Sequence, residues 1–282
     1  MRKVKVSCAA KLNLALNVFE KSGKFHPIDS VVTSVGLYDS VTVTERKDRF
    51  VTVNEIEGIN PATNTAYKAA LLFSDAFGTN GADIVLKKNI PVATGMGGSS
   101  ADICAVLHAL SLLYGKFTYK IYRVAEILGS DTVFMMQGGL ARITGRGQYV
   151  EQVCCPCKLH FAVTFFDKQI SAADAYAAFD SAGGEHTDID ALVHCLAEGN
   201  TQRAISLMGN SLQKTIGRGY CDGYLEFCAL NGVKTCMTGS GSAFFAMFST
   251  QSDAMKFVRL LNDNGFNSLY LSSVEKKDAI IL

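Results

Sequence analysis

A segment rich in glycine and serine, residues 91–102, has the composition best suited to chemistry in this chain. It reads PVATGMGGSSAD and contains three glycines, Gly95, Gly97 and Gly98. Because glycine has no Cβ atom, the backbone can turn tightly here and come close to a ligand. A helix predicted to begin at Ser100 adds unpaired N–H groups and the positive end of its dipole, which attract an anion. The hydroxyls of Ser99 and Ser100 can hydrogen-bond a phosphate or bind Mg²⁺. We therefore predict a phosphate-binding loop.

The two best-known glycine motifs do not fit this segment. A P-loop needs a lysine directly after its last glycine, and Ser99 follows Gly98 instead. The dinucleotide-binding fingerprint needs a glycine at position 100, which is serine. A glycine turn that binds no ligand remains the structural alternative, but the paired serines and the apolar helix after them favour phosphate binding.

Three polar residues stand in otherwise apolar surroundings. Lys11 interrupts a strand-like segment, and Asn13 lies on the same face because side chains alternate along a strand. Lysine is costly to bury without a partner, so this face is either exposed or part of a polar site. Asp131 precedes the apolar run VFMM, where it can cap a helix or act as a base.

The elements that must position these residues alternate between strands and helices in the first half. We expect strands over Val4–Val18, Asp29–Glu45 (broken at Gly36), Phe50–Ile56 and Gly81–Lys88. We expect helices over Thr65–Phe77, capped by Asn64, over Ser100–Tyr114, and over Thr118–Leu128. The second of these helices is apolar on most sides, which is typical of a buried helix. Gly129 is expected to end the third helix with a positive φ.

The pattern changes after about residue 155. A strand over Leu159–Phe166 is followed by helices over Ala172–Ser181, Asp188–Glu198, Ala204–Gly209 and Tyr220–Asn231. Strands over Lys234–Met237 and Ala243–Phe248, a helix over Ser252–Asn264 and a final strand over Ser268–Leu271 complete the chain. This order predicts an α+β domain with an antiparallel sheet and a domain boundary near Gln152–Lys158.

Composition excludes several classes of protein. The 282 residues are 48% apolar and carry a net charge of +1 without a basic block, so neither disorder nor a nucleic-acid surface is indicated. We expect no signal peptide and no membrane span, and therefore a cytoplasmic protein with nine reduced cysteines. Cys154, Cys155 and Cys157 resemble half of a zinc site, but a second pair at suitable spacing is missing and His160 follows too closely.

Four segments spread over almost the whole chain resemble the GHMP kinases, the superfamily of galactokinase, homoserine kinase, mevalonate kinase and phosphomevalonate kinase. The glycine loop is similar to their signature. The other three segments are similar to their Ala-Lys-x-Asn-Leu, Gly-Ala-Asp-Val-Pro-Phe and Gly-Ser-Gly motifs: Ala10–Leu14, Gly129–Phe134 and Met237–Ser242.

Shorter stretches resemble one branch of that superfamily. Phe25–Ile28, Gly36–Asp39 and Gly145–Gly147 are similar to the branch that phosphorylates the 2-hydroxyl of 4-diphosphocytidyl-2-C-methyl-D-erythritol in non-mevalonate isoprenoid (terpenoid) biosynthesis. At four positions in these segments the chain has its own residues: Gly23-Lys24 replaces Asp-Gly, Phe25 replaces Tyr, and Val133 replaces Pro.

The resemblance implies a two-domain α+β fold that binds ATP, Mg²⁺ and an alcohol. Residues 1–155 would form a ribosomal-protein-S5-like domain and residues 156–282 a ferredoxin-like one, with the substrates in the cleft between them. Asp131 would take the proton of the attacking hydroxyl, while Lys11 keeps Asp131 ionised.

The same resemblance implies which residues bind each substrate. ATP is expected at Asn64, Lys88, Pro91, Gly95, Met96, Gly97, Gly98, Ser99 and Ser100, with Ser100 also contacting Mg²⁺; Lys88 has the alternative of an ordinary strand-end lysine. The alcohol is expected at Asn13, Phe25, His26, Asp131, Gly239 and Ser240, with Phe25 stacked on cytosine and His26 hydrogen-bonded to its edge.

The alternative functions are another reaction carried out by the same fold, or ligand binding without catalysis. The alcohol could instead be mevalonate, phosphomevalonate or homoserine, or the chain could be a diphosphomevalonate decarboxylase. In another class, it would be a ligand-binding protein without catalysis. The chain is compatible with a monomer or a homodimer, and neither a nucleic acid nor a membrane is expected as partner.

Overall fold

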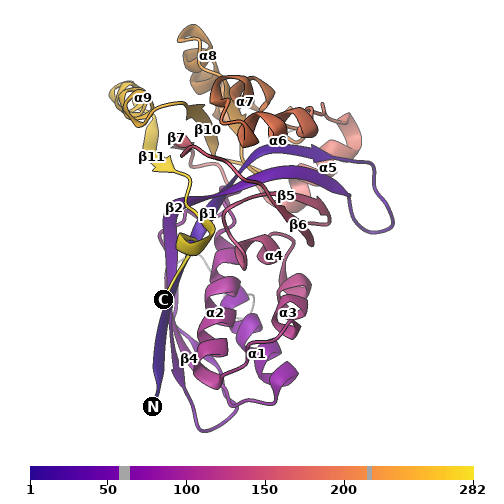
Figure 1. Ribbon diagram of the computed structural model, residues 1–282, viewed down its shortest axis with the longest axis vertical. Helices are drawn as coiled ribbons and strands as arrows, with labels where there is room; N and C mark the ends of the chain where they lie inside the picture. The colour runs from indigo at the N-terminus through magenta and orange to yellow at the C-terminus, as the bar shows by residue number, and fades with distance from the viewer. Residues whose placement is uncertain (57–63, 215–217) are drawn as a thin grey trace.

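Two β-sheets organise the chain in a computed structural model that describes residues 1–56, 64–214 and 218–282. The eight-stranded sheet forms the lower part of the molecule and the four-stranded sheet the upper part (Figure 1). Two long strands, β1 (Lys3–Val18) and β2 (Ile28–Glu45), rise from the N-terminus into the upper part and connect the two regions. The α+β architecture predicted from the sequence is confirmed.

Strands β1 and β2 pair antiparallel with two irregularities. In one, Ala9 faces Tyr38 and Ala10 faces Val35, so Gly36 and Leu37 bulge out of β2 at the predicted break. In the other, Leu14 has no partner on β2. Bulges twist a strand and redirect its side chains. These two lie on either side of Lys11 and Asn13.

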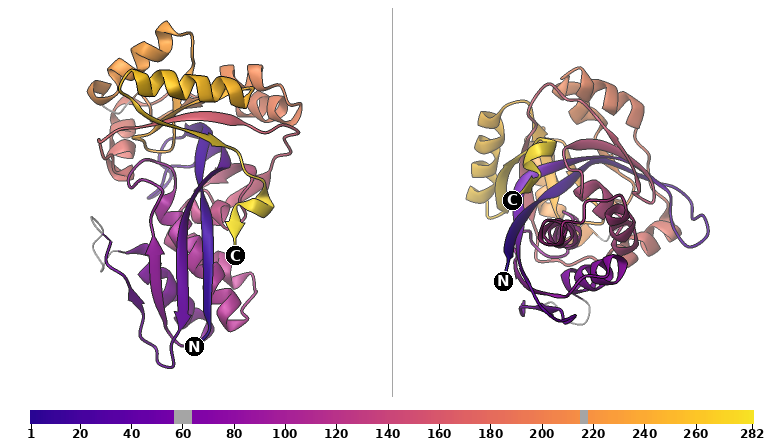
Figure 2. Two further views of the ribbon diagram at one scale, coloured as in Figure 1. Left: turned by 90° about the vertical axis from the view of Figure 1, so that its left-hand side faces the viewer. Right: turned by 60° about the horizontal axis from the view of Figure 1, so that its bottom comes forward.

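Helices cover one face of the larger sheet, as Figure 2 shows in its right-hand view. They are α1 (Thr65–Phe77), α2 (Gly98–Tyr114), α3 (Lys120–Leu128) and the short α4 (Thr132–Met135). Helix α2 is buried on most sides, as its composition predicted, because it lies between the sheet and α1 and α3. The Asn64 side chain accepts from the Ala66 N–H at 2.9 Å, so the predicted helix cap is confirmed.

The larger sheet has the strand order β12-β1-β2-β4-β3. The remaining strands of its first half are β3 (Thr52–Val53), β4 (Ala82–Lys87), β5 (Leu140–Gly145) and β6 (Tyr149–Gln152). Strand β5 pairs antiparallel with β2 and with β6, so β5 and β6 form a hairpin at the edge of β2.

The smaller sheet is antiparallel throughout, with the order β11-β7-β10-β9. Its strands are β7 (His160–Phe165), β9 (Thr235–Met237), β10 (Phe244–Phe248) and β11 (Asn267–Ser272). In chain order this is the fourth, first, third and second strand, the arrangement of a ferredoxin-like unit. The helices of this half are α5 (Ala172–Ala182), α6 (Ile189–Ala197), α7 (Thr201–Leu207), α8 (Asp222–Leu230) and α9 (Gln251–Asp263).

Two segments of the second half return to the larger sheet. Strand β8 (Gly209–Asn210) pairs with β1 at Ala15 and Leu16, and β12 (Ile280–Ile281) pairs with β1 at Ser7 and Cys8. The sequence predicted that the strand over Ser268–Leu271 would be the last one, but β12 follows it. A division at residues 155 and 156 separates the two sheets along most of the chain, but the C-terminus packs on the first domain. Short 3₁₀ turns occupy Arg218–Tyr220 and Lys276–Asp278.

Two local predictions were wrong. The strand expected over Phe50–Ile56 shrinks to β3, because the Asn54 side chain bonds both the N–H and the C=O of Leu86 and so replaces the ladder there. Gly129 has a φ of −179°, which is extended rather than left-handed. Space explains this glycine: a Cβ atom would lie 2.9 Å from Thr132 Oγ1.

Membrane insertion by a helix was also considered. Across the described residues, every helix is too short or too polar to cross a bilayer.

Candidate active site

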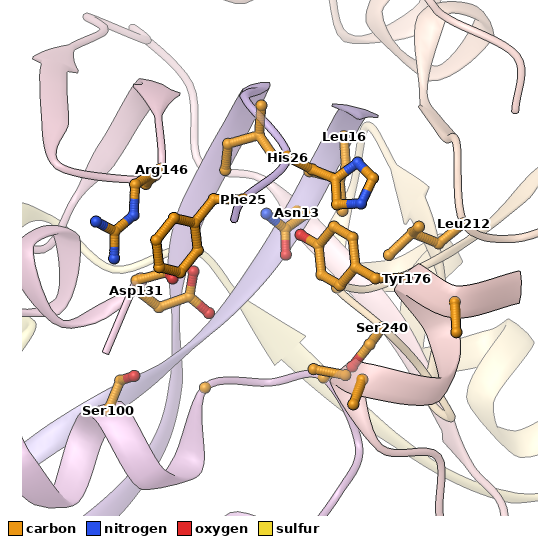
Figure 3. A pocket seen from close by; sticks show the side chains of 18 of the residues that line it. Asn13, Leu16, Phe25, His26, Ser100, Asp131, Arg146, Tyr176, Leu212 and Ser240 are labelled. Atoms are coloured by element: carbon orange, nitrogen blue, oxygen red, sulfur yellow. The ribbon is translucent and has the colours of Figure 1, made fainter. Parts of the chain in front are cut away.

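Two adjacent pockets lie between the two halves of the chain. The larger pocket, about 690 Å³, is lined from β1, β2, α5 and the loop after β9, and Figure 3 shows it from close by. The loop pocket, about 450 Å³, is lined mainly by the glycine loop and the start of α1. The residues common to both pockets are Gly95, Gly97, Ser100, Asp131, Ala172 and Ser240. Both volumes suit small ligands, and the pockets meet at Asp131.

A buried ion pair marks this junction. The Lys11 ammonium lies 3.2 Å from the Asp131 carboxylate and also donates to Asn13 Oδ1. Lys11 is only 2% exposed, whereas the Asp131 side chain is 30% exposed and faces the pocket. A lysine at this depth needs a carboxylate partner. The structure therefore brings together Lys11, Asn13 and Asp131, which the sequence singled out separately.

At Lys11 and Asn13, the backbone N–H groups of β1 point away from β2 and bond to two loops. The Lys11 N–H donates to Met96 O at 3.0 Å, and the Asn13 N–H donates to Thr238 Oγ1 at 3.1 Å. A Cβ at Gly97 would lie 3.0 Å from Lys11 Cγ, so this glycine leaves room for the lysine stem. The glycine loop and the loop after β9 thus pack on the segment of β1 that carries the polar residues.

Asp131 occupies the position just before α4, yet its side chain makes no capping bond. The carboxylate is therefore free to pair with Lys11 rather than with the helix. Gly129, two residues earlier, lets this turn pass close to Ser100, since a Cβ there would lie 3.4 Å from Ser100 Oγ. The alternative that the Asp131 side chain caps this helix is therefore not observed.

The glycine loop docks directly on the loop after β9. The N–H of Ser242 donates to Ala93 O at 3.3 Å and that of Ala243 to Thr94 O at 3.2 Å. Gly95 has a φ of 76°, and a Cβ there would lie 2.1 Å from Thr238 O. Gly239 lies on the other side of this contact, and a Cβ atom there would lie 2.8 Å from Gly95 O. The Asn210 amide holds the second loop by donating to the carbonyls of Met237 and Gly239.

Helix α2 begins at Gly98, two residues earlier than predicted. Its cap residue Gly97 contributes no side-chain oxygen, so the first N–H groups of the helix stay available to an anion. Ser99 and Ser100 line the loop pocket beside them, as do Asn64, Pro91 and Gly98. Met96 also lines this pocket, although the residue is only 1% exposed.

Lys88 is not available for a direct phosphate contact in this structure. Its ammonium pairs with Asp39, with Asp102 Oδ2 at 2.8 Å, and with Gly98 O at 3.3 Å. An ammonium has three hydrogens, and these three acceptors use all of them. Burial raises the pKa of Asp102 to about 7; the charge of Lys88 opposes that rise and the charge of Asp39 adds to it. Neither prediction for Lys88, a phosphate contact or an ordinary strand-end lysine, describes this arrangement.

Sequence reasoning missed two residues of α5 that face His26. The His26 ring stacks on Tyr176 with centroids 5.2 Å apart, and its Nε2 lies 3.1 Å from Asp180 Oδ1. Its Nδ1 lies 2.9 Å from Phe19 O. Burial, and next the nearby charge of Asp131, raise the pKa of Tyr176 to about 12, so its hydroxyl stays neutral. The alanine-rich helix α5 contains none of the recognised motifs, so the sequence gives no local signal for these contacts.

Three cations, together with Phe25, line the exposed mouth of the larger pocket. The Arg146 guanidinium lies 3.6 Å from the centre of the Phe25 ring, and the exposed Lys21 and Lys24 line the same pocket. No carboxylate pairs with these three cations within residues 1–56, 64–214 and 218–282. Figure 3 shows Phe25 and Tyr176 on opposite sides of the pocket, with Arg146 beyond Phe25.

The three clustered cysteines do not build a metal site with the residues described. Cys155 and Cys157 lie 3.5 Å apart through their sulfur atoms, while Cys154 is exposed and His160 Nδ1 bonds Tyr270. Burial raises the pKa of Cys155 to about 11, which disfavours the thiolate that a metal needs. Among the described side chains, no group of three His, Cys, Asp or Glu is arranged to hold a metal ion.

Comparison with known proteins places this geometry in a family. A family model described as the GHMP kinases N terminal domain matches residues 64–141. The 4-diphosphocytidyl-2-C-methyl-D-erythritol kinase of Desulfitobacterium hafniense (strain Y51) is 31% identical, over 97% of this chain and 97% of its own length.

Two solved structures are also similar. A crystal structure of a 4-(cytidine 5'-diphospho)-2C-methyl-D-erythritol kinase aligns with a TM-score of 0.75 at 25% identity, covering 96% of this chain and 100% of its own. A homoserine kinase from Cytophaga hutchinsonii aligns with a TM-score of 0.77 over 100% of this chain and 97% of its own. At 17% identity this second likeness shows the fold alone.

The fold and the matched signature define the class: a small-molecule kinase of the GHMP superfamily. Within that superfamily, the chain belongs to the 4-diphosphocytidyl-2-C-methyl-D-erythritol kinase family. It is accordingly an ATP-dependent phosphotransferase that uses an alcohol group as acceptor.

We predict that Gly95→Ala weakens ADP binding more than tenfold, measured by calorimetry. The added Cβ would force the glycine loop away from Thr238, in addition to the strain of a left-handed φ. Gly78→Ala is the matched control, because Gly78 has a φ of 63° with nothing within 4 Å of its Cβ position. The control should lose about 1 kcal/mol of stability and keep ADP affinity. If both variants bound ADP equally well, the contact between the glycine loop and the loop after β9 would not be needed for ADP binding.

Proposed function

We propose that the chain transfers the γ-phosphate of ATP to the 2-hydroxyl of 4-diphosphocytidyl-2-C-methyl-D-erythritol, as part of isoprenoid biosynthesis. The observation that supports this most directly is the meeting of two pockets at one buried ion pair, Lys11–Asp131. A kinase needs a donor site and an acceptor site that open on a shared point of reaction. The similar proteins described above are named as kinases of this alcohol, which supports the choice of acceptor.

The loop pocket is the proposed ATP site. The first N–H groups of α2 point toward it, and the serine hydroxyls at positions 99 and 100 line it. In this proposal the triphosphate lies along the glycine loop and the adenine lies toward Asn64 and Thr65. Asn64 already caps α1 through its oxygen, so it contributes to the site by shaping the start of that helix.

Asp131 and Lys11 are the proposed catalytic pair. Asp131 accepts the proton of the attacking hydroxyl as the oxygen bonds to the γ-phosphorus and ADP leaves. Lys11 pairs with this carboxylate and, as a nearby cation, would lower the pKa of the substrate hydroxyl. Asn13 orients the lysine through its amide oxygen. Most of the rate enhancement in phosphoryl transfer comes from positioning and charge neutralisation, and the glycine loop and Lys11 supply both.

Mg²⁺ is the proposed metal, and the residues present fit it. Ser100 lies at the junction of both pockets beside Asp131, which gives a hydroxyl and a carboxylate where the transferred phosphate must lie. Mg²⁺ is commonly held by one or two protein oxygens together with substrate phosphates. When bound, it would neutralise charge on the β- and γ-phosphates.

The larger pocket is the proposed acceptor site. Its volume of about 690 Å³ suits a nucleotide ester. Phe25 and Tyr176 stand on opposite sides, so a cytosine ring can insert between them, since the other face of Phe25 is covered by Arg146. Asp180 lies at this end, is partly exposed and can reach the edge of the base, whereas both ring nitrogens of His26 already have partners, so His26 positions Asp180 instead of bonding the base as the sequence predicted. Gly239 and Ser240 line the opposite wall.

The cations at the mouth of this pocket suit the diphosphate of that substrate. Lys21, Lys24 and Arg146 have no carboxylate partner among the described residues, so an anion can use their charges without breaking an ion pair. Mevalonate and homoserine each carry one carboxylate and no diphosphate, so they would match fewer of these three charges. A cytoplasmic location is part of the proposal and is supported by the nine free cysteines.

The proposed reaction is tested by ADP release from Mg²⁺-ATP with the cytidyl alcohol, mevalonate, phosphomevalonate and homoserine as acceptors. We expect turnover with the first and at least about 100-fold lower kcat in Asp131→Asn, because a positioned base contributes about 10²–10⁴. The control is Asp75→Asn, an exposed acid on α1 away from the pockets. Activity on another alcohol only would overturn the substrate assignment, and nucleotide binding without any turnover would favour a binding protein. Release of CO₂ would indicate a decarboxylase.

The cationic mouth makes a second prediction. Lys24→Ala should raise the KM of the cytidyl alcohol about three- to tenfold with kcat unchanged, because a charge that binds ground state and transition state alike affects KM alone. The effect should shrink as salt is raised, since exposed charges are screened. Lys120→Ala, an exposed lysine on α3, is the matched control. An unchanged KM in Lys24→Ala at low salt would contradict a diphosphate at this position.

A further inference from the structure

One ammonium group closes the base of the glycine loop. Lys88 follows β4 and contacts two carboxylates, Asp39 on β2 and Asp102 on α2, together with the Gly98 carbonyl at the start of α2. Asp39 is fully buried, Asp102 is 3% exposed, and the Lys88 side chain is 13% exposed. The ion pairs of Asp39, Lys88 and Asp102 do not include Lys11 or Asp131. The cluster therefore lies outside the proposed catalytic pair.

These contacts tie both ends of the loop to the same point. Before the loop, Asp39 Oδ1 accepts from the N–H groups of Asn89 at 2.6 Å and Ile90 at 2.8 Å. After the loop, Lys88 holds α2 through Asp102 and through the Gly98 carbonyl. A Cβ at Gly98 would lie 3.3 Å from Lys88 Nζ, so the glycine permits this approach. The chain leaving β4 and the first turns of α2 are thereby fixed relative to β2.

The loop between these ends needs such a restraint. Ala93 has a φ of 58°, the left-handed region that costs a non-glycine residue about 1–2 kcal/mol. Gly95 and Gly97 also have positive φ, and glycine is the most flexible residue in the unfolded chain. A strained loop keeps one conformation only where its surroundings determine it. The contact with the loop after β9 restrains its middle, and the Lys88 cluster restrains its ends.

We propose that Asp39 and Asp102 are positioning residues for the nucleotide, because through Lys88 they hold the glycine loop in the conformation that binds phosphate. This inference rests on the proposed ATP site. It assigns Lys88 an indirect role: the ammonium organises the loop and leaves phosphate binding to backbone N–H groups and serine hydroxyls. Buried ion pairs contribute little net stability, and their better-supported use is to specify one conformation.

Two substitutions at Asp102 separate positioning from stability. Asp102→Ala removes the acceptor for Lys88, whereas Asp102→Asn removes the charge and keeps an oxygen that can accept from it. We expect Asp102→Ala to weaken ADP binding at least tenfold by calorimetry, and Asp102→Asn less than threefold. The KM of the alcohol should stay within twofold in both, since the larger pocket does not include Asp102. Melting temperatures are recorded for each variant.

A purely structural role gives another result. If Asp102→Ala melts at a lower temperature but its folded form binds ADP like the wild type, the proposal is overturned. Because ADP binding is measured without an alcohol, a failure of the substrate assignment does not affect this outcome.

Asp39→Asn provides a second variant in case Asp102→Ala does not fold. Its oxygen can still accept from Asn89 and Ile90, while its NH₂ group replaces the oxygen that faces Lys88. We expect faster amide hydrogen exchange over residues 93–100 and weaker ADP binding in this variant. Unchanged exchange and unchanged ADP affinity would overturn the proposal.

Discussion

The buried ion pair between Lys11 and Asp131 is the interaction on which the site depends. A lysine at 2% exposure is unfavourable unless a carboxylate and further acceptors surround it. Strand β1 carries the lysine, the turn before α4 carries the carboxylate, and Asn13 completes the contacts. Removing one partner would leave a buried charge unpaired. The same pair therefore stabilises the junction of the two pockets, and in the proposed mechanism it supplies the base and the cation for alcohol phosphorylation.

Around this pair, the two halves of the chain are joined through their loops. The glycine loop contacts β1 through Met96 and contacts the loop after β9 through Ala93, Thr94 and Gly95. Strands β8 and β12 add pairing between β1 and the second half. The loop pocket and the larger pocket consequently share lining residues, and a change in the position of one loop alters both. This arrangement explains why glycines occur where backbones meet, as at Gly95 and Gly239.

Features set by local sequence were predictable, and features set by tertiary contact were not. Asn64 before α1 and the apolar sides of α2 follow from capping and periodicity, and both predictions are confirmed. Tyr176 and Asp180 approach His26 only because α5 packs over the β1–β2 hairpin, which no local pattern encodes. Lys88 was expected to contact a phosphate or to be an ordinary lysine at a strand end. Instead, its ion pair with Asp39, which is 49 residues away in the sequence, determines its position. The roles of Lys11 and Asp131 stay predictions.

The most direct test of the central claim is a ³¹P NMR spectrum of the complete reaction with Mg²⁺-ATP and 4-diphosphocytidyl-2-C-methyl-D-erythritol. The account predicts a new phosphomonoester resonance that appears in step with ADP, while the diphosphate resonances of the acceptor persist. Coupling of that phosphorus to carbon 2 of the methylerythritol unit would place it on the expected hydroxyl. Inorganic phosphate as the only new phosphorus species, or a phosphate on a cytidine hydroxyl, would contradict the account.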